Sequence, residues 1–267
     1  LCVHQRPPVP AALSYAASQT LMQSRPLPPS KEQIDLLAPF DRLGLERIEL
    51  ISTPVQAQRA AASLRASSAW GFDTESKPTF SVGEASDGPH VVQLATLEQA
   101  WVFQLHDPDC LAEVAALLAW PGAVKAGFGL GDDRKRIQSK LGIEPVRVHE
   151  LGHDFRQRGY RQQIGVKSAV ALLFERRFAK SKKAATSNWS RLDLSESQLL
   201  YAANDAHGAA MVHAALPGWE LRQPAAAQRP SRPALEPRGP RESSAPQTPR
   251  PPRTARLLQA AVAPAKS

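Results

Sequence analysis

The chain has 267 residues, a net charge of +8 and a pI of about 9.8, and 42% of its residues are hydrophobic. This length allows one domain of good size with appendages. No apolar run approaches the ~20 residues that span a bilayer, which excludes a membrane-spanning helix. We expect no secretory signal. With only two cysteines, Cys2 and Cys110, we expect neither a structural disulfide nor a zinc site. The sequence therefore predicts a cytoplasmic protein in a reducing compartment.

Composition divides the chain into three zones. We predict a flexible leader at 1–30, a folded domain at 31–216, and a disordered basic tail rich in Pro, Arg and Ala at 217–267. The tail holds nine Arg or Lys and three Asp or Glu, which is +6 of the net +8. Basic chains favour polyanionic partners. Because the remainder is close to neutral, we expect nucleic-acid contacts in the domain to come from local patches.

Periodicity within the central zone predicts strands that alternate with helices. The expected strands are Ile48–Ser52, Trp70–Asp73, Val91–Ala95, Trp101–Leu105, Val124–Gly127 and Val146–Leu151. The expected helices are Val55–Leu64, Cys110–Leu118, Asp133–Leu141, Val166–Phe174 and Ser195–Leu216. Strands joined by helices indicate an α/β sheet flanked by helices. The short turn between the third and fourth strands favours a mixed rather than a purely parallel sheet.

Two acidic residues lie at the end of the second expected strand. Asp73 and Glu75 are two positions apart, so an extended chain points both side chains to the same face. Two carboxylates held that close repel each other unless a cation lies between them. The pair is therefore half of a candidate metal site, and we expect the other half farther along the chain.

The last expected helix supplies one part of that other half. Tyr201 and Asp205 are four residues apart, so they project from one face of the helix. Ser195 and Gln198 form a predicted capping box at its start. Small residues around Asp205 would let this helix approach a sheet closely, within reach of the first pair.

A glycine-rich turn before the third expected helix supplies the remaining carboxylate. Asp133 shares its row of the helix with Ile137 and Leu141, which form the apolar row, so we predict that it points inward. Asp132 shares its row with two basic residues, so we predict that it is the N-cap.

The resulting set of candidate ligands is rich in hard oxygen donors. Carboxylates without clustered Cys or His favour Mg²⁺ or Mn²⁺ over zinc. Two divalent cations held by carboxylates are suited to in-line phosphoryl displacement, with a nearby phenol that positions or helps to deprotonate the attacking water. The set is Asp73, Glu75, Asp133 and Asp205, with Tyr201 as the phenol.

In this order and spacing, the motifs resemble the DnaQ-like (DEDD) 3′–5′ exonuclease superfamily, in its tyrosine-containing DEDDy branch, and most of all its Werner-type and ribonuclease D-type domains. The resemblance covers Ile48 to Leu216. Its motifs are Phe72–Glu75, Lys77–Phe80, Val91–Ala95, Gly127–Asp133, Ile164–Ser168, Ser187–Ser190 and Tyr201–Ala206. The branch is decided by Tyr201, because Leu200 stands where the His-containing branch has its histidine.

That resemblance implies a ribonuclease H-like mixed sheet and a metal-dependent 3′–5′ exonuclease with two divalent cations, Mg²⁺ or Mn²⁺. It implies that Asp73, Glu75, Asp133, Tyr201 and Asp205 are catalytic, and that nucleoside 5′-monophosphates are released from a free 3′ end. The choice between DNA and RNA stays open, as does the oligomeric state. The alternative is a catalytically inactive nucleic-acid-binding or scaffold protein on a nuclease fold, against which the complete carboxylate set argues.

Several residues outside the acidic set are candidate nucleic-acid contacts. Lys167, Lys182, Lys183 and Arg191 are candidates for phosphate contacts. Phe128 is the first candidate for stacking on a terminal base. The ordinary alternatives are a solvated basic surface for the cations and core packing for the aromatic ring.

Overall fold

A six-stranded mixed sheet lies at the centre of residues 26–79 and 87–222, the part of the chain that this computed structural model describes. Its strand order is β1-β4-β3-β2-β5-β6. β3 runs antiparallel to both of its neighbours, and the other pairs are parallel. The mixed sheet predicted from the short turn is therefore confirmed. The strands are β1 (Ile48–Ile51), β2 (Ala69–Glu75), β3 (Val91–Ala95), β4 (Ala100–Gln104), β5 (Val124–Gly127) and β6 (Val148–Glu150).

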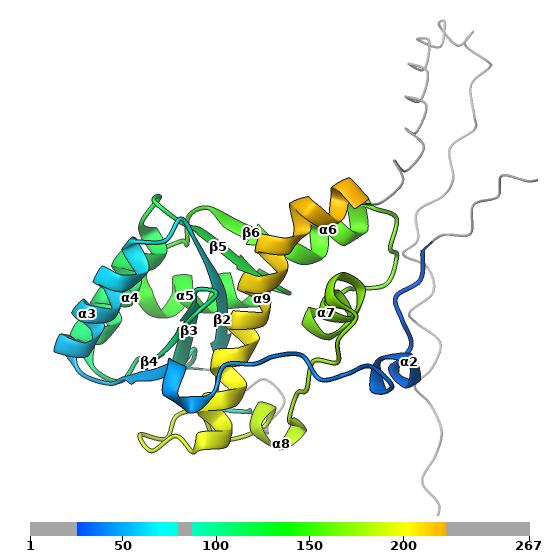
Figure 1. The fold of residues 1–267 in the computed structure, drawn as a ribbon. Helices are drawn as coiled ribbons and strands as arrows, with labels where there is room; N and C mark the ends of the chain where they lie inside the picture. Colours follow the sequence, from blue (N-terminus) through cyan, green and yellow to red (C-terminus); the bar gives the residue numbers. More distant parts are fainter. Residues whose placement is uncertain (1–25, 80–86, 223–267) are drawn as a thin grey trace, which may run out of the picture. The chain divides into compact units, whose positions relative to one another are not determined.

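Helices cover both faces of the sheet (Figure 1). α3, α4 and α5 share one apolar cluster with the sheet, and α6, α7 and α9 pack on the other face. α9 crosses the strands diagonally. The helices are α2 (Lys31–Asp35), the 3-10 turn η1 (Leu45–Arg47), α3 (Pro54–Arg65), α4 (Pro108–Ala119), α5 (Gly131–Leu141), α6 (Leu151–Gln157), α7 (Val166–Phe174), α8 (Lys182–Ala185) and α9 (Glu196–Arg222).

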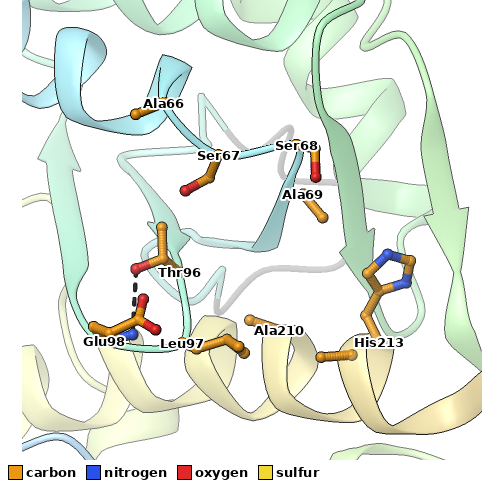
Figure 2. A pocket seen from close by; sticks show the side chains of 10 residues that line it. Ala66, Ser67, Ser68, Ala69, Thr96, Leu97, Glu98, Ala210 and His213 are labelled. Carbon is orange, nitrogen blue, oxygen red and sulfur yellow. Dashed lines mark hydrogen bonds between the residues drawn. The ribbon is translucent and has the colours of Figure 1, made fainter. Parts of the chain in front are cut away.

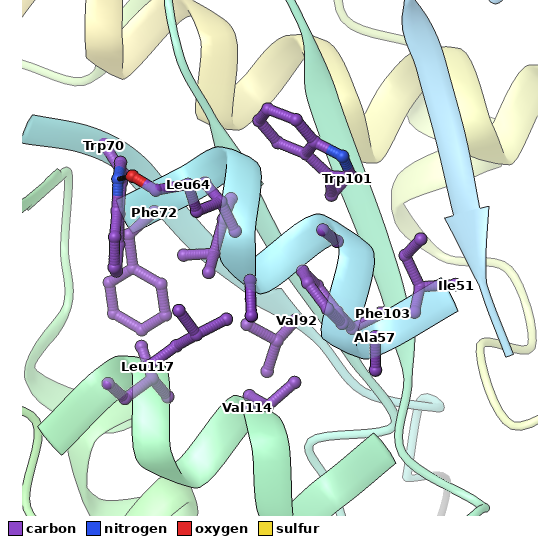
Figure 3. Close-up of a cluster of buried hydrophobic side chains, with 14 of the residues drawn as sticks. Ile51, Ala57, Leu64, Trp70, Phe72, Val92, Trp101, Phe103, Val114 and Leu117 are labelled. Atoms are coloured by element: carbon purple, nitrogen blue, oxygen red, sulfur yellow. Dashed lines mark hydrogen bonds between the residues drawn. The ribbon is translucent and has the colours of Figure 1, made fainter. Parts of the chain in front are cut away.

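The side chains of β2 alternate between the two faces of the sheet. Trp70 and Phe72 are fully buried in the cluster beneath α3 and α4, which Figure 3 shows. Gly71 lies on the opposite face, where a Cβ would overlap the carbonyl oxygen of Ala206 in α9. Because side chains alternate along a strand, Asp73 and Glu75 follow Gly71 toward α9. The strand therefore delivers its two carboxylates directly under the last helix.

The start of α9 follows the predicted capping box. The backbone N–H of Gln198 donates to the Ser195 hydroxyl, and the Ser195 backbone N–H donates to the Gln198 side chain at 3.0 Å. The predicted end of the helix at Leu216 is wrong: α9 continues through Pro217 to Arg222. None of the helices among the described residues is long and apolar enough to cross a membrane.

Short elements depart most from the sequence prediction. The strand expected over Val146–Leu151 is confined to β6, and Leu151 instead begins α6, where the Glu150 carboxylate accepts from the Gly152 N–H. α2, α6 and α8 were not predicted, because five, seven and four residues are too few to show a helical period. The predictions for residues 1–25 and for the tail from 223 onward lie outside the described residues, as does Phe80.

Candidate active site

Three of the predicted carboxylates meet between β2 and α9. Asp73, Glu75 and Asp205 each place an oxygen so that these atoms all lie within 4.8 Å of one another. Asp205 is only 5% exposed, and the two strand residues are half-buried. The α9 backbone can come this close because small side chains flank Asp205 and because Gly71 lies beneath the helix. The prediction that the helix and the strand pair converge is confirmed.

Asp133 approaches this group from the other face of the sheet. Its carboxylate accepts a hydrogen bond from the Thr74 hydroxyl, and Thr74 points away from its neighbours Asp73 and Glu75. The negative charge of Asp133 nevertheless raises the pKa of Asp73, so the two carboxyl groups interact electrostatically. Asp133 is thus inward-facing, as predicted, but it stands beside the group of three rather than within it.

The predicted role of Asp132 is wrong. α5 begins at Gly131 with Leu130 as its N-cap residue, and Asp132 is exposed in the first turn with an ion pair to Lys135 at 3.0 Å. The loop before α5 is instead held by Glu150. Its carboxylate accepts from the backbone N–H groups of Gly129 at 3.0 Å and Leu130 at 2.8 Å. No signal for this role existed in the sequence, because Glu150 lies inside the strand expected over Val146–Leu151 and its closeness to the loop depends on the pairing of β6 with β5.

Burial raises the pKa of every carboxyl group in the site, and repulsion from neighbouring carboxylates adds to it at Asp73 and Glu75. Burial is the largest cause in each case. The charges of Asp73 and Asp205 add to it at Glu75, whose pKa rises to about 9. The charges of Asp205 and Asp133 add to it at Asp73. Negative charge at these carboxyl groups is therefore unfavourable in the metal-free site, and their hard oxygen donors fit a divalent cation of the Mg²⁺ or Mn²⁺ type.

Tyr201 lies one turn before Asp205 on α9 and is half-buried. Burial raises the pKa of its phenol, and the charges of Asp205, Glu75 and Asp73 raise it further. The phenol therefore stays protonated at neutral pH. It can orient a water molecule by hydrogen bonding, but it is not a base.

Lys180, which was not predicted from the sequence, is a basic residue that contacts the acidic group directly. Its Nζ lies 2.6 Å from Asp205 Oδ2 and 5.4 Å from the centre of the Tyr201 ring. It stands in a stretch with Lys182 and Lys183, and no local pattern distinguishes the lysine that points inward. The ion pair lowers the pKa of Asp205 against the larger effect of burial.

The candidate nucleic-acid contacts are only partly brought to the site. Lys167, Lys182, Lys183 and Arg191 are all exposed. The charge of Lys167 lowers the pKa of Asp205, so it acts electrostatically on the site. Phe128 is partly buried and packs against the core cluster beneath α6 and α7, which favours the packing interpretation.

A separate cavity of about 360 Å³ lies at the opposite end of β2, between Ser68, Thr96 and His213 (Figure 2). The strand begins at this cavity and ends at the acidic residues, and none of the candidate site residues lines the cavity. The cavity is therefore separate from the group formed by Asp73, Glu75 and Asp205.

Comparison with known proteins agrees with this arrangement. The family described as 3′–5′ exonuclease matches residues 48–217. No curated protein matches the chain. Among solved structures, the EXO domain of Aedes aegypti Nibbler is similar with a TM-score of 0.59 and 21% identity, covering 69% of this chain and 93% of that one.

Two further structures show the same fold. RNase D of Escherichia coli, an exoribonuclease involved in structured RNA processing, has a TM-score of 0.56 at 20% identity and covers 64% of this chain. RNase D of Trypanosoma brucei in complex with RNA U12 has a TM-score of 0.57 at 18% identity and covers 70% of it. This chain spans 44% and 65% of those two chains. By the extent of the sequence match, which includes every residue of the acidic site, the chain belongs to the 3′–5′ exonuclease family.

Proposed function

We propose that this protein is a DEDDy-type 3′–5′ exonuclease that removes nucleoside 5′-monophosphates from a free 3′ end of a nucleic acid. The observation that carries the proposal is the group formed by Asp73, Glu75 and Asp205, whose oxygens lie within 4.8 Å of one another beside Tyr201. The T. brucei RNase D structures with RNA U12 and with GMP support a nucleic-acid substrate and a nucleotide product.

The residues divide the chemistry among them. Asp73, Glu75 and Asp205 would hold one divalent cation, Mg²⁺ or Mn²⁺, and Asp133 would help to hold a second. When bound, the two cations supply Lewis-acid stabilisation of the negative charge at the scissile phosphate. Tyr201 orients the attacking water through its neutral hydroxyl. Water adds to phosphorus and loses one proton to the solvent. The bond to the 3′ oxygen of the preceding nucleotide breaks and that oxygen takes up a proton from the solvent, so the phosphate remains on the 5′ side of the released nucleoside.

The test is digestion of matched DNA and RNA strands that carry a 5′ label, with Mg²⁺ or Mn²⁺. We expect a ladder that shortens from the 3′ end, release of 5′-monophosphates, and complete loss of cleavage with a chelator. Asp73→Asn and Asp205→Asn should each lower the rate about 100-fold or more. Tyr201→Phe should lose most activity while it still binds Mn²⁺, because only the water-orienting hydroxyl is removed.

Asp132 and Asp133 provide a matched control. Asp133→Asn should lower turnover, whereas Asp132→Asn, one residue away on the exposed side of α5, should not. If the wild-type protein binds Mn²⁺ and both strands but cleaves neither, the protein is a nucleic-acid-binding member of the family and the proposed activity is wrong. The faster of the two strands identifies the substrate class.

A further inference from the structure

Lys180 is held at the acidic site by structure on both sides of it. Phe178, two residues earlier, is 2% exposed within the core cluster, and Ser181 caps α8 by accepting from the Ala184 N–H at 3.2 Å. α8 in turn packs against α9, next to which Figure 1 shows it. The backbone around Lys180 is therefore fixed, and its side chain is 28% exposed.

The ammonium group occupies a position at which the site requires positive charge. It is 2.6 Å from Asp205 Oδ2, and the Asp205 side chain is only 3% exposed. Asp73 and Glu75 also interact electrostatically with Lys180. Carboxylates held within 4.8 Å of one another repel strongly in a poorly solvated site. An ammonium group is a compact point charge, which makes it the side chain most similar to a bound cation.

We propose that Lys180 is the resident counter-cation of the metal-free site, that it competes with divalent metal for Asp205, and that it is displaced from Asp205 when metal binds. This inference rests on the proposed function, since it concerns the same carboxylates. In the metal-free protein Lys180 holds Asp205 in place beside β2. A divalent cation must break that ion pair to bind Asp205. Once bound, it is repelled by the nearby Lys180 ammonium, and both effects oppose metal binding.

Removal of the Lys180 charge should strengthen metal binding, although the residue lies in the site. Lys180→Met should bind Mn²⁺ more tightly than the wild type, by about fivefold to tenfold, because competition and repulsion are both removed. The metal-free variant should unfold at a lower temperature than the wild type, because a largely buried carboxylate loses its partner. A lysine that only supports the local fold would give the lower unfolding temperature with unchanged or weaker metal affinity.

The measurement is Mn²⁺ titration of the full chain without nucleic acid, by calorimetry and by the electron paramagnetic resonance signal of free Mn²⁺. Lys180→Arg keeps the charge and should match the wild type more closely than Lys180→Met does. Lys135→Met removes the same charge from a residue paired with the exposed Asp132 and should leave the affinity unchanged. Lys180→Gln repeats the test if the Met variant fails to fold.

The outcomes separate the two proposals. If the wild type binds Mn²⁺ and the Met and Gln variants bind it equally or more weakly, Lys180 does not compete with metal and this inference is wrong, while the proposed function stands. If the wild type does not bind Mn²⁺ at all, the proposed metal-dependent function fails and this inference fails with it. Tighter binding in both variants, with Lys135→Met unchanged, supports the inference.

Discussion

The position of some site residues could be predicted from the sequence around them, and that of others could not. The spacing of Asp73 and Glu75 on a strand, and of Tyr201 and Asp205 on a helix, placed all four correctly because both periods are fixed by backbone geometry. The inward direction of Asp133 followed from its helix row. By contrast, Lys180 lies in a loop, where no period orients a side chain, and its position depends on packing between segments distant in sequence.

The residue-scale prediction concerns Glu75 and pH. In the metal-free protein its pKa is raised from 4.5 to about 9 by burial and by the charges of Asp73 and Asp205. A carboxyl group with a raised pKa contributes stability that is complete below about pH 4.5 and is lost as the pH rises toward 9. We therefore expect the free energy of unfolding to fall across that range when a chelator is present. The free energy of unfolding of the Glu75→Gln variant should fall less over the same range. At pH 9 the variant should be more stable than the wild type by about 1 kcal/mol or more.

Urea denaturation at several pH values measures this difference. Glu98→Gln, which changes an exposed carboxylate in the turn between β3 and β4, is the control and should follow the wild type. Adding Mn²⁺ should reverse the order, because the wild type gains stability from the bound cation and the variant gains less. Parallel pH profiles for the wild type and Glu75→Gln would show that the buried carboxyl group does not titrate as described.

Elements were predicted well where they were long and poorly where they were short. The expected strands overlap the observed ones, and the long helices were found from their period and their caps. α6 and α8 were missed because each is a brief turn determined by a local cap, at Glu150 and Ser181. The contact between β2 and α9, which creates the site, was expected only in outline from the small residues of α9.

Gly71 tests that contact between the two elements. A Cβ at this position would overlap the backbone of Ala206 and approach that of Ala210, and backbone atoms cannot move aside without shifting α9. We expect Gly71→Ala to destabilise the protein by about 1–3 kcal/mol and to weaken Mn²⁺ binding, because Asp205 moves away from Asp73. Urea denaturation and Mn²⁺ titration measure the two effects.

Gly131→Ala is the matched control for this substitution. Gly131 begins α5, and a Cβ there meets nothing within 4 Å. Its stability should stay within about 0.5 kcal/mol of the wild type. Equal effects of the two substitutions would mean that the close approach of α9 does not position the carboxylates.

At the scale of the whole molecule, the alternation of expected strands and helices was enough to predict the α/β class, and the spacing of the acidic residues was enough to predict that distant carboxylates converge. Most of the net positive charge lies outside the part of the chain that forms the sheet and its helices. Residues 227–267 hold eight Arg or Lys and two Asp or Glu, so without them the net charge of +8 falls to +2. The last helix of the described residues, α9, ends at Arg222, before this segment begins. The segment can therefore be removed without cutting through the sheet or its helices.

We expect a chain that ends at Ala226 to keep the turnover of the full chain at saturating substrate. Its KM should be several-fold higher at low ionic strength, because fewer cations attract the phosphate backbone, and the difference should vanish at about 0.5 M salt. A full-length variant with Gln in place of the eight basic residues separates charge from length and should behave like the truncated chain. If turnover falls while KM is unchanged, the segment contributes to the chemical step and not to electrostatic capture of the substrate.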